Sequence, residues 1–236
     1  MDLEADERPS ESPGVERIWS SRSAQPGEFI SVAVNHSELV ITRRRGTLRI
    51  TLRGPETKAT KAYAPGEAEF MGIIFKLGTY MPKLPIPTLV DGYIDLPQAT
   101  SQSFWLNGSA WEVPTFENAD TFADRLVRQG LLVHDPIVDT VLQGEVSDLS
   151  ARSTQRRFLR ATGLTHTIVR QIERARYATM LLKQGTSILD TVFEAGYFDQ
   201  PHLTRSVKQY IGQTPAQIMD EDREERLSFL YGSSHL

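Results

Sequence analysis

Polar side chains suited to recognising nucleic acid gather near the C-terminus, in the stretch "DQPHLTRSVKQYI" from Asp199 to Ile211. Its early positions carry Gln200, His202 and Arg205. Arginine can grip guanine through O6 and N7, and glutamine can pair with adenine. Apolar residues recur between them at helical spacing, namely Leu203, Val207, Tyr210 and Ile211. The pattern predicts an amphipathic helix with one face in a core and the other toward a polar partner.

The residues around this helix predict a helix-turn-helix. Asp199 is suited to cap its start and Gly212 to end it. A short helix, "ILDTVFEAG", precedes it behind the cap Ser187, and the break falls at "GYF", residues 196–198. In such a motif the second helix lies in the major groove and its N-terminal residues touch base edges. An ordinary helical hairpin with a solvated polar face fits this segment about as well.

A second stretch with the same logic favours the DNA-binding interpretation. "SARSTQRRFLRATG" begins with the cap Ser150 and ends at Gly163, with Phe158 and Leu159 expected inside. Its early exposed positions are Arg152, Gln155, Arg156 and Arg157. The helix predicted over residues 165–185 would be about 30 Å long. It would hold the two reading helices about 34 Å apart, one turn of B-DNA, so that both enter successive major grooves.

The two stretches also resemble a family. "ILDTVFEAGYFDQPHLTRSVKQYIGQTPAQI" is similar to the second helix-turn-helix of the AraC/XylS-type transcription regulators, and "LSARSTQRRFLRATGLT" to their first reading helix. The resemblance covers about residues 135–218. It implies base reading by Arg152, Gln155, Arg156, Gln200, Pro201, His202 and Arg205. It implies backbone-facing roles for Arg157, Thr204, Lys208 and the helix N-terminus at Thr214.

Two departures from the family pattern concern the site. The first unit is compressed, since only "GEVSDL" separates its two helices. Pro201 cannot donate a hydrogen bond to a base and offers only apolar contact, for example to a thymine methyl.

The charge of the chain is unevenly distributed. The net charge is -4, yet residues 145–218 carry 10 Lys/Arg against 6 Asp/Glu, while the segments before and after are acidic. A local basic excess is the electrostatic signature of a nucleic-acid partner. There is no run of apolar residues long enough to span a membrane, and the acidic start is unlike a secretory signal, so we expect a cytoplasmic protein without a membrane partner.

The order of patterns predicts an α+β protein in three parts. Residues 1–27 are rich in Glu, Ser, Pro and Arg and are expected to form a disordered arm, on which Ile18 and Trp19 could dock. Short alternating runs such as "TLRITLR" predict a β-rich barrel or sandwich over residues 28–131, for sensing or dimerisation. Residues 132–236 are expected to form the all-α double helix-turn-helix domain with an acidic tail.

The front domain carries no recognisable catalytic set. The chain has no cysteine, and His36 is the sole histidine before residue 134, so we expect neither a metal site nor an enzyme, and no cofactor. Phe104, Trp105 and Trp111 could line a ligand pocket but are more often core. "TRRRG" at 42–46 could hold a phosphate, and a charged hairpin flank is the simpler interpretation.

We expect a DNA-binding transcription regulator, and double-stranded DNA is the expected partner. The family resemblance adds three candidate partners: a small-molecule effector, RNA polymerase and a second copy of the chain. One alternative is a ligand-binding or enzymatic β domain that uses the helical half only as its address on DNA. Another is a protein-interaction module built on the tail motif "LSFLYG".

Overall fold

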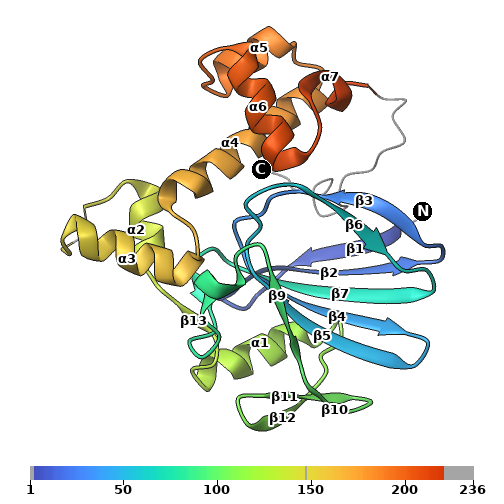
Figure 1. Ribbon diagram of the computed structural model, residues 1–236. Coiled ribbons are helices and arrows are strands. Elements are labelled where there is room, and N and C mark those ends of the chain that lie inside the picture. The colour runs from blue at the N-terminus through green and yellow to red at the C-terminus, as the bar shows by residue number, and fades with distance from the viewer. Residues whose placement is uncertain (1–2, 147, 221–236) are drawn as a thin grey trace. The chain divides into compact units, whose positions relative to one another are not determined.

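The computed structural model describes residues 3–146 and 148–220, with strands in the first half and helices in the second (Figure 1). This arrangement confirms the predicted α+β class. The tail motif "LSFLYG" and most of the predicted acidic tail lie outside the described residues.

A six-stranded antiparallel sheet organises the first half. In spatial order its strands are β1 (Leu3–Pro9), β2 (Val15–Ser23), β7 (Ala68–Phe75), β4 (Glu38–Arg44), β5 (Thr47–Arg53) and β9 (Tyr93–Leu96). In β5 the alternation predicted from sequence is confirmed, because Leu48, Ile50 and Leu52 are buried while Thr47 and Arg49 are exposed. One face of this sheet therefore supplies core side chains.

Smaller elements complete the β-rich half. They are the three-stranded sheet of β10 (Gln98–Thr100), β11 (Ser103–Leu106) and β12 (Ser109–Glu112), the pair β8 (Thr79–Tyr80) and β13 (Val133–His134), the pair β3 (Gly27–Ser31) and β6 (Thr60–Ala64), and the 3-10 helix η1 (Ile86–Leu89).

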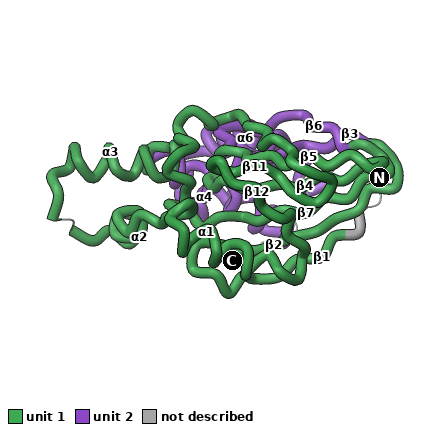
Figure 2. Tube along the Cα trace, turned by 90° about the horizontal axis from the view of Figure 1, so that it is seen from below, with its two compact units in different colours: residues 1–26, 35–55, 65–166 green, residues 27–34, 56–64, 167–236 purple. Residues whose placement is uncertain are grey.

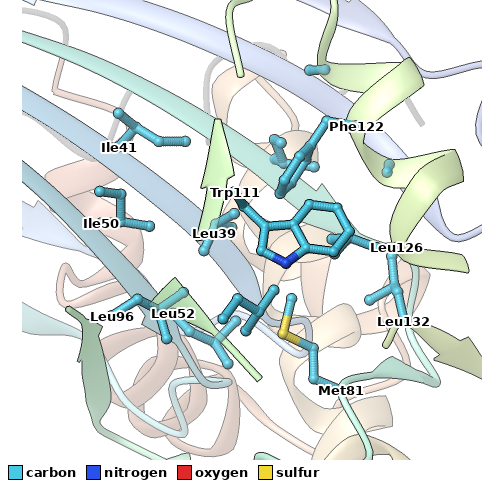
Figure 3. Packing of buried hydrophobic residues seen from close by; sticks show 14 of the residues in the cluster. Leu39, Ile41, Ile50, Leu52, Met81, Leu96, Trp111, Phe122, Leu126 and Leu132 are labelled. Atoms are coloured by element: carbon cyan, nitrogen blue, oxygen red, sulfur yellow. The ribbon is translucent and has the colours of Figure 1, made fainter. Parts of the chain in front are cut away.

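The main core lies between the sheet and helix α1 (Ala119–Arg128). Trp111 packs edge-on against Phe122, with ring centroids 5.8 Å apart, beside Leu126 and Met81 (Figure 3). Phe104 and Trp111 are fully buried, so the core interpretation is confirmed for these two aromatics. Trp105 differs: it exposes 47% of its surface.

The predicted disordered arm over residues 1–27 is wrong. Residues 3–9 and 15–23 form β1 and β2, and β2 pairs along its length with β7 from Val15↔Phe75 to Ser23↔Ala68. The polar composition misled because β1 borders only β2, and because β2 gains its stability from ladder hydrogen bonds and from the burial of Val15 and Ile18. Trp19 is also buried, as the expected docking of this pair required.

Six helices follow after β13 in the part of the chain that the structure describes. They are α2 (Ile137–Gln143), α3 (Ala151–Thr162), α4 (His166–Lys183), α5 (Ile188–Glu194), α6 (Gln200–Ile211) and α7 (Pro215–Ile218). Each falls where periodicity and caps predict a helix. The predicted N-caps Ser150, Ser187 and Asp199 each accept a backbone N–H three residues later, which satisfies a donor that the helix leaves unpaired.

The chain folds into two compact units (Figure 2). The first comprises residues 1–26, 35–55 and 65–166, and the second comprises 27–34, 56–64 and 167–236. This division departs from the boundary predicted at residue 132, since α2 and α3 belong to the first unit. Two short β segments of the front half belong to the second unit, together with α5 to α7.

Across the described part of the chain, every helix is too short or too polar to cross a membrane.

Candidate nucleic-acid interface

The second helix pair, α5 and α6, is joined by a tight turn. Ala195 ends α5, Gly196 adopts a φ of +66°, and Asp199 begins α6 by accepting the His202 N–H at 2.7 Å. The left-handed backbone at Gly196 is one that residues with a Cβ rarely adopt. The turn therefore fixes the angle at which α6 leaves α5.

The inner face of α6 is held by apolar packing. Leu203, Val207 and Ile211 are fully buried and Tyr210 nearly so, as the sequence predicts. At the end of the helix, the Tyr210 hydroxyl donates to Gln171 Oε1 on α4 at 2.8 Å. These contacts fix α6 against α4 within the second unit.

Tyr197, in the turn, adds a polar clamp. Its hydroxyl is 2.9 Å from Ser206 Oγ on α6, and both residues are buried. Arg174 on α4 lies over the Tyr197 ring at 4.5 Å and donates to the Gly196 carbonyl at 3.4 Å. Burial raises the pKa of the Tyr197 phenol, so the hydroxyl keeps its proton at neutral pH. The clamp ties α4, the turn and α6 together.

The outer face of α6 presents most of the predicted reading residues. Gln200, Pro201, Arg205 and Lys208 are exposed, and Thr204 is partly exposed. His202 is partly buried: its ring meets Tyr197 edge-on at 5.1 Å, and its Nδ1 accepts the Phe198 N–H at 3.5 Å. The face is thus a stripe of hydrogen-bonding side chains with one apolar member, Pro201, in the first turn of α6.

In the first helix pair, α3 presents its own stripe. Arg152, Gln155 and Arg156 are exposed, and Phe158 is buried, as predicted. Leu159 was expected inside, but it exposes 40% of its surface. The early turns of α3 therefore carry two guanidinium groups and one amide toward solvent.

Arg157, predicted to face the DNA backbone, has an internal partner. Its Nη2 lies 2.6 Å from Asp135 Oδ1, and its Nε donates to Asp135 Oδ2 at 3.2 Å. Asp135 is only 3% exposed, and Arg160 lies 3.7 Å from its other oxygen. A bidentate pair of this kind fixes side-chain geometry, so Arg157 anchors α3 to Asp135, two residues before the start of α2.

Thr214, the remaining predicted backbone contact, forms a complete capping box. Its Oγ1 accepts the Gln217 N–H at 3.3 Å, and its own N–H donates to Gln217 Oε1 at 2.9 Å. Pro215 follows at the first helical position, where its missing N–H costs nothing.

The structure gathers the predicted reading residues into two stripes, one on α3 and one on α6. The two helices belong to different compact units. The predicted spacing of one DNA turn between them therefore stays a prediction. Among residues 3–146 and 148–220, there is no group of three His, Asp or Glu side chains that could hold a metal ion.

One candidate was missed from sequence. Phe198 exposes 90% of its surface immediately before the cap of α6. The sequence pattern placed Phe198 only in the break between the two helices, and its position one residue before the N-cap is the signal that could have indicated exposure.

Comparison with known proteins bears on the helical part. A family model described as a helix-turn-helix domain matches residues 145–221, about a third of the chain. An HTH-type transcriptional regulator, RipA from Corynebacterium glutamicum, is 33% identical over 88 residues. That stretch makes up 36% of this chain and 27% of the relative, so the chain matches about a quarter of the relative's length.

Two solved structures align with most of the chain at low similarity. ToxT from Vibrio cholerae has 9% identity and a TM-score of 0.35, with 93% of this chain and 98% of ToxT covered. ToxT from Vibrio cholerae O395, bound to (E)-4-(8-methylnaphthalen-1-yl)but-3-enoic acid, has 8% identity and a TM-score of 0.36 over the same shares. The family model thus identifies a helix-turn-helix domain of the AraC type in residues 145–221.

Proposed function

We propose that this protein is a sequence-specific transcription regulator whose helices α3 and α6 read successive major grooves of one DNA site. The observation that carries the proposal is the pair of capped helices, each with exposed Arg and Gln side chains in its first turns. A helix-turn-helix places these first turns against base edges.

We assign base contacts to Arg152, Gln155 and Arg156 on α3. On α6 we assign them to Gln200, Pro201, His202 and Arg205. Lys208 and Thr204 are suited to phosphate oxygens, as is the N-terminus of α7 at Thr214. Arg157 can add a phosphate contact only through the part of its guanidinium that Asp135 leaves open, and we regard it first as an anchor.

A gel-shift series on the full chain with genomic fragments tests the proposal. Selective retention of some fragments at physiological salt, with excess random DNA present, is the expected result. Equal affinity for all fragments would refute sequence-specific regulation, because nonspecific binding comes from phosphate contacts alone.

Phe198, one residue before the N-cap of α6, and Pro201, in the first turn of α6, are both apolar and exposed, and we propose that they contact a thymine methyl. Replacing individual thymines by deoxyuridine in a selected site removes single methyl groups. One such replacement should weaken wild-type binding and leave the Phe198→Ala variant unaffected. Equal weakening of both proteins at every position would exclude the contact.

The β-rich half is proposed to sense a small effector. It contains an open groove of about 420 Å³ on the six-stranded sheet. Ile41, Met71 and Phe116 line it together with charged side chains that include Arg22 and Arg43. Candidate metabolites that bind there should change DNA affinity, which titration of a labelled site measures. Contacts with RNA polymerase and with a second copy stay predictions, and sedimentation of the free protein tests the latter.

A further inference from the structure

Two short segments of the front half belong to the same compact unit as α6. Residues 27–34 and 56–64 form a two-stranded ribbon, hereafter the β3–β6 ribbon (Figure 2). Its strands pair from Gly27↔Ala64 to Ser31↔Thr60. Val34 and Glu56 then exchange two backbone hydrogen bonds of 3.0 and 2.9 Å. The ribbon is therefore closed at this end by a regular backbone bridge.

The ribbon caps the C-terminal end of α6. A helix leaves its last four carbonyls without internal partners. The Ala33 N–H donates to the Tyr210 carbonyl at 2.7 Å, and the Ala59 N–H donates to the Gln209 carbonyl at 2.8 Å. The Lys208 carbonyl accepts from Gly212, the helix's own C-cap. The ribbon thus satisfies two of the last four carbonyls, which helices usually leave to water or to their own C-cap.

Side-chain packing closes the same junction. Ala33 is fully buried and Ile30 is 6% exposed. A Cβ on Gly212 would lie 2.8 Å from Ile30 Cγ2 and 3.1 Å from Ala59 Cβ. Gly212 also has a φ of +88°, so both the lack of space and the backbone conformation favour glycine at this position. The ribbon and the helix end are in direct contact, and neither can shift alone without breaking these hydrogen bonds.

We propose that the β3–β6 ribbon positions α6 for DNA reading. We also propose that the front half controls the position of α6 through this ribbon. The inference rests on the proposed function. Base contacts at the N-terminus of α6 require a fixed helix axis, and the ribbon fixes the opposite end. The chain crosses between the ribbon and the other unit four times, after residues 26, 34, 55 and 64. A change in the front half that favours another ribbon position therefore also favours another position of α6.

The alternative is that the ribbon caps α6 only to stabilise the fold. A stabilising cap and a positioning element lead to different predictions. Loss of such a cap would lower the free energy of unfolding and leave DNA selectivity unchanged in the folded protein. Loss of a positioning element would lower the ratio of specific to nonspecific affinity. This ratio is insensitive to the fraction of unfolded protein, because unfolding removes both kinds of binding equally.

The test compares two proline variants of the full chain. Ala59→Pro removes the N–H that reaches Gln209. Lys58→Pro is the matched control, because Lys58 is exposed and its N–H has no backbone acceptor among the residues that the structure describes. We expect Ala59→Pro to lower the specific-to-nonspecific ratio about tenfold relative to Lys58→Pro. Equal ratios for two folded variants would overturn the proposal.

Hydrogen exchange on the wild-type chain tests the contact without any variant. The amides of Ala33 and Ala59 should be protected as strongly as those of α6. Exchange at the rate of an open loop would overturn the ribbon contact whether or not the protein binds DNA. Protected amides in a protein without selective DNA binding would instead refute the proposed function and, with it, the role of the ribbon in reading.

Discussion

The two helix pairs of this protein are built alike and held differently. The second pair is fixed by a mostly neutral network, which consists of the buried bond of Tyr197 with Ser206, the partly buried bond of Tyr210 with Gln171, and the Arg174 guanidinium over an aromatic ring. On the first pair, the polar anchor of α3 is the ion pair between Arg157 and Asp135.

The outer faces of α3 and α6 also differ in charge. The exposed side of α3 carries Arg152, Arg156 and Arg160, while the exposed side of α6 mixes Gln200 and Pro201 with Arg205 and Lys208. A charge-rich helix gains affinity through phosphates, and a helix held in fixed geometry can discriminate bases. We propose that both helices read bases and that α3 adds more phosphate affinity than α6 to these base contacts.

The largest effect is expected from breaking the anchor of the first pair. Arg157→Ala leaves the buried Asp135 carboxylate without its close partner and should lower the free energy of unfolding by about 3 kcal/mol. Arg156→Ala, one residue earlier and exposed, should change it by less than about 0.5 kcal/mol. Urea unfolding of both variants measures the contrast. Equal stabilities would mean that the ion pair does not anchor α3.

Removing a reading arginine from either helix should have a smaller effect. It should lower the free energy of DNA binding and leave the stability of the fold unchanged. Arg205→Ala should weaken a selected site by about 2 kcal/mol and relax the preference at one base pair. Arg156→Ala should act in the same range at a different base pair. Competition with single-base variants of the site locates both effects. A loss that is equal on selected and random DNA would reassign the residue to a phosphate.

Removal of the Tyr197 hydroxyl tests its hydrogen bond to Ser206 in the second helix pair. Tyr197→Phe leaves the Ser206 hydroxyl buried without its partner and should lower the free energy of unfolding by about 1 kcal/mol. Adding Ser206→Ala should recover part of that loss, because the Ser206 hydroxyl is then no longer buried without its partner. Thermal unfolding of the two single variants and the double variant gives the coupling. Strict additivity would show that the hydrogen bond contributes nothing.

The smallest effect is expected at the edge of α6. Lys208→Ala should weaken selected and random DNA alike and reduce the slope of log affinity against log salt by about one. Binding titrations at several salt concentrations provide the slope. A loss confined to the selected site would place Lys208 at a base edge.

Local signals explain most of what the sequence could predict. The caps at Ser150, Asp199 and Thr214 act within three residues, so their types and spacing suffice to locate α3, α6 and α7. The outward position of Arg205 likewise follows from its place opposite Leu203 and Val207 on one helix. Properties that depend on residues within one turn of helix can be predicted from the sequence.

What sequence reasoning missed depends on distant partners. Strand β2 looked disordered because its burial depends on β7, some fifty residues later. Arg157 looked free because Asp135 lies a long way back along the chain. The ribbon contact joins Ala33 to Tyr210, and neither residue type indicates the other. Only folding brings such groups together, and the periodicity of the sequence does not indicate these distant contacts.

The central claim, that both helices read one site, is tested most directly by the spacing of the bases they recognise. Sites selected by the full chain from random DNA should contain two conserved blocks whose centres lie about 10 base pairs apart. Inserting five base pairs between the blocks turns one groove away from its helix and should abolish selective binding. A single conserved block, or undiminished affinity after the insertion, would contradict the claim.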